Sequence, residues 1–375
     1  MKSHKTRILV LIAVVAVAAL VWFGRHRIHF NWGVFVEQLR QADWGRMAVA
    51  LACIYFGYVI RSVRWAMLMR HAKKVPPFSL IGTQVIGFTA VALIGRVADL
   101  VRPYLVSKKT LQPLGSQIAV YIVERLFDAG AMALIVSAAL LWVPQDEILR
   151  VASRSGLLAH LAMHHRVFVV VLERFGGLII TVAGAAILVW LRFTGEGIVR
   201  SFETVFGLIS PKVGRAVAEK VRTFHSGLDT IRSLSDFVIA AALSVGMWLL
   251  IAAAYLEGTR AFTASPALAG ISIPKCALLM LASGGASMIQ LPVIGWFSQI
   301  AIVAGLLGAM FGASPEAAMA CAAALLLVTS LAIAPVGLIW ARFEHVSLKK
   351  VAEESEHAGE ELAHHAPEPV RSEVG

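Results

Sequence analysis

The sequence predicts an all-α polytopic membrane protein with about six full transmembrane helices and two re-entrant helical hairpins that enter from opposite sides of the membrane. Of its 375 residues, 58% are hydrophobic and the mean hydropathy is +0.75. Only 15% are charged, whereas a soluble domain carries about 25%. Several apolar runs also approach the roughly 20 residues that a spanning helix needs. Together these features exclude a soluble enzyme, a secreted disulfide scaffold and a disordered protein.

Six apolar runs are long enough to cross a bilayer as helices. The first follows Lys2, Lys5 and Arg7 as a signal peptide would, but no small-residue cleavage site comes after it, so we expect an uncleaved anchor. The six predicted spans are Ile8–Phe23, Met47–Leu68, Gln117–Val143, Val167–Leu191, Phe237–Glu257 and Ala317–Ala341.

Two further apolar runs do not fit a simple span. Ser79–Ile94 is short and leads into charged residues, and Lys275–Phe311 is too long and is interrupted around Pro292. If both return to the side from which they enter, 21 Lys and Arg lie in the cytoplasm and 8 outside. If Ser79–Ile94 crosses fully, the numbers become 10 and 19. Because positive residues favour the cytoplasmic side, we expect re-entrant hairpins and two cytoplasmic termini.

The remaining segments leave little room for a second domain, so residues 1–341 are predicted to form one membrane domain. Within it, residues 193–233 are basic and amphipathic, which is typical of a linker lying on the cytoplasmic leaflet. Residues 31–45 resemble a short surface helix on the other side. The charged, His-rich segment 342–375 is expected to be a disordered cytoplasmic tail.

Charge and cysteine content exclude further classes. The net charge of +11 fits cytoplasmic loops that contact anionic lipids, so we expect no nucleic-acid partner. All three cysteines, Cys53, Cys276 and Cys321, lie inside apolar runs, which argues against disulfides and metal sites. The chain has no phosphate loop, nucleophile elbow or HExxH motif. We therefore expect no cofactor and no enzymatic activity.

Ionisable groups inside a membrane are costly and are functional candidates by default. Arg61 and Arg64 are three residues apart, so they share one face of the second span. Arg64 could instead extend its side chain to the cytoplasmic phosphates. Further along, Arg96, Asp99 and Arg102 follow the first hairpin. They are candidates for an anion site, because guanidinium groups suit a phosphate, although Asp99 and Arg102 could also form a simple salt bridge.

The third span carries Glu124, Arg125 and Asp128. Glu124 and Asp128 are four residues apart and therefore lie on one helix face. Each could neutralise an arginine from the two earlier groups. The resulting buried network could be structural or linked to substrate or protons, and the residues alone leave both readings open.

The second hairpin combines small and polar residues around its break. Gln290 and Gln299 flank the stretch from Pro292 to Gly295, while Ser283–Ser287 is rich in glycine and serine. Small residues allow helices to approach closely. The two glutamines are candidates for uncharged hydrogen bonds at the hairpin tip.

At these positions the sequence resembles the lysylphosphatidylglycerol synthase transmembrane-region family, also called the flippase-like domain. The stretch Arg61–Trp65 matches its RxxRW element, Gly95–Arg102 its GRxGElxR element and Val123–Asp128 its vERxxD element. The similarity extends over about residues 5–342. The family's late PxxGGxGxxE element appears here as Pro292–Gln299, with Gln299 in place of the carboxylate.

The resemblance implies a membrane domain of the bacterial inner membrane that moves a lipid, while a separate domain in the synthases makes the aminoacylated lipid. The chain ends shortly after Ala341, so we expect it to lack that transferase. We therefore expect a translocase for an anionic or isoprenoid-type lipid that uses no ATP. The alternatives are an enzyme or accessory partner acting on polyprenyl-phosphate or glycolipid, and a structural membrane protein. A homodimer and a lipid-biosynthesis enzyme partner are both left open.

Overall fold

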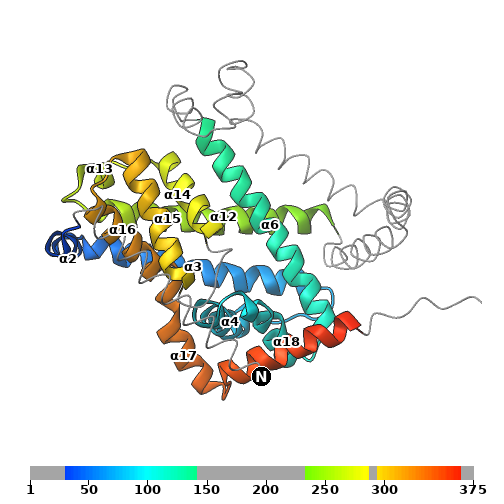
Figure 1. The fold of residues 1–375 in the computed structure, drawn as a ribbon. Helices are drawn as coiled ribbons and strands as arrows, with labels where there is room; N and C mark the ends of the chain where they lie inside the picture. The colour runs from blue at the N-terminus through cyan, green and yellow to red at the C-terminus, as the bar shows by residue number, and fades with distance from the viewer. Residues whose placement is uncertain (1–29, 142–232, 287–293, 365–375) are drawn as a thin grey trace, which may run out of the picture.

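The computed structural model describes residues 30–141, 233–286 and 294–364, and every element in these ranges is helical (Figure 1). Four helical segments in them are long and apolar enough to cross a membrane, namely Trp44–Met69, Pro77–Ile94, Leu234–Arg260 and Pro315–Phe343. The all-α membrane fold is therefore confirmed. The expected spans Ile8–Phe23 and Val167–Leu191 lie outside the described residues, as does the linker 193–233 apart from Ser233, so six crossings stay a prediction.

A long antiparallel pair of helices forms the centre of the molecule. Helix α3 (Trp44–Met69) lies beside α12 (Leu234–Arg260) along most of its length (Figure 1). Ion pairs join them at both ends: Arg46 lies 2.8 Å from Glu257, and Asp236 accepts from Arg70 at the other end. The side chain of Ser233 caps α12 in a capping box with Asp236. The short surface helix expected around residues 31–45 is present as α2 (Trp32–Arg40).

The first predicted hairpin, Ser79–Ile94, is a single helix in the structure, and the limb that returns along it comes later in the chain. Helix α4 (Ile81–Ile94) follows a 3-10 turn at Pro77–Leu80 and ends at Gly95, whose φ of 93° suits a residue without a Cβ. The chain turns through η2 (Arg96–Leu100) and returns along α4 as α5 (Val101–Thr110). Since Pro77–Ile94 is also long enough to span, whether this hairpin is re-entrant remains a prediction.

The second predicted hairpin is built from α14 (Ile273–Ala286) and α15 (Ile294–Phe311), which pack on each other. Near the end of α14 and the start of α15, Gln299 Nε2 donates to Ser283 Oγ at 2.6 Å. The indole of Trp296 also donates to the carbonyl of Ala92, 3.1 Å away on α4. The two hairpins are therefore in direct contact. The third predicted span, which carries Glu124, Arg125 and Asp128, corresponds to α6 (Leu114–Leu141). Helix α6 packs against α5, α12 and α14.

The last predicted span is not a regular helix. Helix α16 (Pro315–Leu326) passes into a π-helical turn at Leu327–Leu331 and continues as α17 (Ile333–Phe343). Pro335 has no N–H to donate to the preceding turn, which accounts for the break. Two carbonyls beside the break also accept from side chains of other helices: Tyr55 donates to Ala332 and Thr89 to Ile333.

The expectation of a disordered tail from residue 342 was wrong for much of that segment. Residues Leu348–His364 form helix α18, which lies on η2 and α5 (Figure 1). Although most residues of α18 are charged or polar, the helix has one small apolar face, in which Val351 and Ala352 are buried. Glu354 accepts a 2.7 Å hydrogen bond from the hydroxyl of Tyr104. Packing against the membrane domain therefore orders a segment whose composition alone suggests disorder.

Candidate functional site

A buried ion network joins α3 to α6. Arg64 lies 2.6 Å from Glu124 and 2.7 Å from Asp128, and its side chain is 0% exposed. Its Nη1 also donates to Ser244 Oγ of α12 at 2.5 Å. The two carboxylates are one turn apart on α6 and face α3, as their spacing predicts. The alternative in which Arg64 extends to the cytoplasmic phosphates was therefore wrong.

Arg102 brings the first hairpin into the same network. Its guanidinium donates to Glu124 Oε2 and to Gln84 Oε1, each at 3.0 Å, so it pairs with α6 rather than with Asp99. A Cβ on Gly87 would overlap the side chain of Arg102, which explains why that position has none. The cation also lies over aromatic rings, with the centroid of Phe88 closest at 4.4 Å. Such contacts stabilise a desolvated guanidinium.

Arg61 and Arg125 belong to the network but face a cavity. Arg61 lies 3.4 Å from Asp128 and 3.6 Å from Glu124, which are longer separations than those of Arg64. Arg125 lies 2.9 Å from Asp128, and its side chain is 36% exposed. Both line the cavity, whereas Arg64 and Arg102 do not. All four arginines therefore have a carboxylate nearby, and two of them, Arg61 and Arg125, also face the cavity and can reach a ligand.

The network carries more positive than negative charge. Among the side chains that the structure describes there, four guanidinium groups meet two carboxylates. Asp99 lines the same cavity and contributes one further negative charge, which leaves an excess of one. Arg61, Arg64 and Arg102 are buried, whereas the side chain of Arg125 is 36% exposed, so the excess charge lies partly on a side chain that a ligand can reach. The site is therefore suited electrostatically to an anion.

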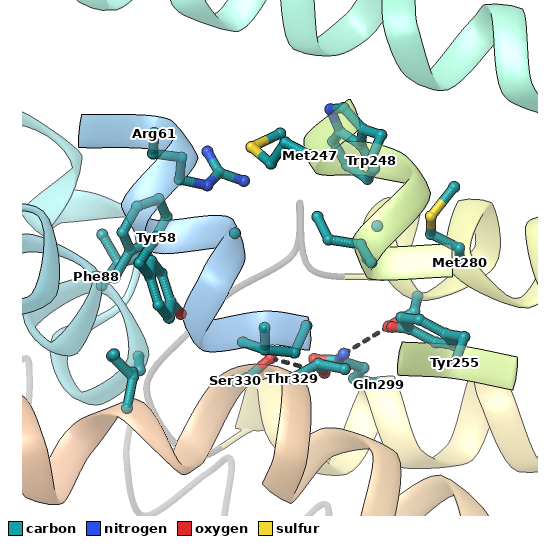
Figure 2. A pocket seen from close by; sticks show the side chains of 18 of the residues that line it. Tyr58, Arg61, Phe88, Met247, Trp248, Tyr255, Met280, Gln299, Thr329 and Ser330 are labelled. Carbon is teal, nitrogen blue, oxygen red and sulfur yellow. Dashed lines mark hydrogen bonds between the residues drawn. The ribbon is translucent and has the colours of Figure 1, made fainter. Parts of the chain in front are cut away.

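The cavity itself has a volume of about 230 Å³ and lies among α3, α4, α12, α14, α15 and the π-helical turn. Figure 2 shows Arg61 at one end, apolar and aromatic side chains along the walls, and a group of neutral polar residues at the other end. The wall residues include Tyr58, Phe88, Met247, Trp248 and Met280. We call the neutral group, which consists of Tyr255, Ser283, Gln299, Thr329 and Ser330, the polar end.

The structure brings most of the predicted site residues together. Arg61, Arg64, Arg102, Glu124, Arg125 and Asp128 form the network, and Asp99 and Gln299 line the cavity. Gly295 is buried at the start of α15, where its carbonyl accepts from Ser298. Gln290, Pro292 and the side chain of Arg96 lie outside the described part of the chain.

Sequence reasoning missed several residues of the site. Tyr255, Thr329 and Ser330 line the polar end, and Ser244 and Gln84 complete the hydrogen bonds of two arginines in the network. The available signal was the presence of a polar residue in an otherwise apolar span, as with Thr329 and Ser330. In the described residues, no group of three or more His, Cys, Asp and Glu is arranged to hold a metal ion.

Comparison with known proteins agrees with this architecture. The family described as Lysylphosphatidylglycerol synthase TM region matches residues 10–337, which include the whole network and cavity. No curated protein and no solved structure matches the chain significantly. Since the family match covers most of the sequence, this chain belongs to the lysylphosphatidylglycerol synthase TM-region family of membrane domains, which is associated with lipid-related functions.

Proposed function

We propose that this protein is a translocase that moves an anionic or isoprenoid-type lipid across the bacterial inner membrane without ATP hydrolysis. The observation that carries the proposal is the cavity beside the ion network, in which four arginines, three of them buried, face three carboxylates among the described side chains. Its volume of about 230 Å³ is below the roughly 300–1,000 Å³ of sites that enclose a whole drug-sized ligand. It would therefore hold a headgroup while the chains of the lipid stay in the bilayer.

The two kinds of arginine would have different roles. Arg61 and Arg125 would bind the anionic group, because they reach the cavity. Arg64 and Arg102 would keep Glu124 in place, since both lie within 3.0 Å of its carboxylate. An anion in the cavity would offset the excess positive charge, so the headgroup would meet a preformed partner in a region of low dielectric.

The remaining properties follow from the same proposal. Movement would be passive or coupled to an ion, and both termini would face the cytoplasm. We propose no catalytic role for any residue. A second copy of the chain or a lipid-biosynthesis enzyme would be a partner if the translocase acts within an assembly.

The proposal is tested by leaflet exchange in liposomes that contain the purified protein and fluorescent lipids. Arg61→Gln should slow exchange of an anionic lipid about tenfold or more, because a hydrogen bond to a charged group contributes about 1.5–3 kcal/mol. Arg46→Gln is the matched control. It removes an arginine from the same helix, but Arg46 is 42% exposed and pairs with Glu257 away from the cavity.

Two outcomes would count against the proposal. If no lipid is exchanged by protein that is demonstrably folded, the runner-up, an enzyme or accessory partner acting on polyprenyl-phosphate or glycolipid, is favoured instead. If Arg61→Gln behaves like the Arg46→Gln control, the cationic end of the cavity is not the headgroup site.

A further inference from the structure

The two ends of the cavity differ in charge, and this difference restricts the headgroup. Arg61 and Arg125 make one end cationic. The polar end offers only hydroxyl and amide groups, which come from three separate parts of the fold: α12, the second hairpin and the π-helical turn (Figure 2). A ligand that spans the cavity must therefore carry an anionic group at one end and a neutral polar group at the other.

Gln299 is the most informative residue at the polar end. Its side chain is buried, with 4% of the residue exposed, and its Nε2 donates to Ser283 Oγ at 2.6 Å. Its Oε1 has no hydrogen-bond partner among the described residues. A buried acceptor without a donor is unfavourable, and a ligand that supplies the donor removes that penalty. The cavity is thus built to receive a hydrogen-bond donor beside Gln299.

The donor is better supplied by a hydroxyl than by an ammonium group. Among the described residues that line the cavity, Asp99 is the one carboxylate, and it belongs to η2 rather than to the segments that form the polar end. An ammonium at the polar end would thus be buried without a counter-charge, which is strongly unfavourable. Hydroxyl groups would bond to the Gln299 oxygen and to the neighbouring Thr329 and Ser330 without that penalty.

We propose that Gln299 and the polar end select lipids whose phosphate carries a neutral, hydroxylated group, such as a glycerol, inositol or sugar, and disfavour aminoacylated headgroups. This inference rests on the proposed translocase function and names its substrate class. The phosphate would lie against Arg61 and Arg125, and the hydroxyls would extend past the apolar walls to the polar end.

The test compares leaflet exchange of three labelled lipids by the full chain in liposomes: phosphatidylglycerol, phosphatidic acid and lysylphosphatidylglycerol. The wild type should exchange phosphatidylglycerol at least about tenfold faster than the other two, since each hydrogen bond or unpaired charge changes the rate by that order. Gln299→Glu should raise the rate for the lysyl lipid and lower that for phosphatidylglycerol.

A milder variant guards against misfolding. Ser330→Ala should reduce the preference for phosphatidylglycerol over phosphatidic acid about fivefold. Ser137→Ala, which removes a buried hydroxyl that donates to Ala133 and does not line the cavity, should leave the preference unchanged. Equal exchange of all three lipids would overturn the selectivity but leave the translocase intact, whereas no exchange of any lipid would overturn the translocase itself.

Discussion

Neutralising Glu124 is the most direct test of the ion network. Its carboxylate lies 2.6 Å from Arg64 and 3.0 Å from Arg102, and Arg61 is 3.6 Å away. The side chain of Glu124 is 1% exposed, so water cannot replace these partners. In Glu124→Gln the amide keeps the shape of the side chain but leaves several guanidinium groups without their shared counter-charge. The excess positive charge of the network rises by one.

The expected loss in the free energy of unfolding is about 3–5 kcal/mol, the usual cost of removing one partner of a buried ion pair. Unfolding by denaturing detergent in mixed micelles would measure it. Glu257→Gln is the matched control, because it breaks a pair with Arg46 whose side chains are 23% and 42% exposed. That change should cost less than about 1 kcal/mol.

A double variant separates charge from shape. Combining Glu124→Gln with Arg102→Gln restores the original excess of positive charge, so the double variant should be more stable than the sum of the two single losses predicts. The coupling free energy should be about 1–3 kcal/mol. A loss below about 1 kcal/mol for Glu124→Gln alone, or strictly additive losses, would refute the reasoning that these side chains form one buried charge network.

Two further predictions concern packing and pH. Gly87→Ala should lower the free energy of unfolding by about 1–3 kcal/mol, because the added Cβ displaces Arg102. Gly130→Ala, whose added Cβ meets nothing within 4 Å, should lower it little in the same unfolding assay. Equal losses of stability in the two variants would contradict this packing. The hydrogen bond from Tyr104 lowers the pKa of Glu354 from its ordinary value of 4.5. Glu354 therefore stabilises docking of α18 above that value, and the contribution disappears as the pH falls through the lowered pKa. The protection of α18 amides against hydrogen exchange, relative to the intrinsic exchange rate at each pH, should fall on acidification in the wild type and should fall less in Tyr104→Phe; an unchanged pH dependence in that variant would contradict the argument.

Much of the site could be predicted because its spacing is a local property of helices. Arg61 and Arg64 at a spacing of three, and Glu124 and Asp128 at a spacing of four, must lie on single helix faces wherever those helices are placed. The cost of burying charge then predicts that the two faces meet, and they do. The apolar run that ends at Ile94 and the interruption near Pro292 in the sequence likewise coincide with the end of α4 and with the interval between α14 and α15.

Other features could not be predicted because they depend on residues that are distant in the chain. Arg102 has Asp99 as a sequence neighbour, yet its guanidinium pairs with Glu124 and Gln84. The helix α18 resembles a solvated tail by composition and is ordered by the surface it covers. The polar end contains Tyr255, Gln299 and Ser330, which come from three segments far apart in the chain. No sequence pattern indicates that these three side chains lie close together.

The sequence by itself determined the membrane class, the helical fold, the family resemblance and the charged residues of the site, because each depends on composition or on spacing within one helix. The tertiary structure decided which carboxylates each arginine contacts, which arginines face the cavity, and that the far end of the cavity is neutral. Those distinctions arise from distances of a few ångströms between helices, and in a medium of low dielectric such distances decide which buried charges are compensated.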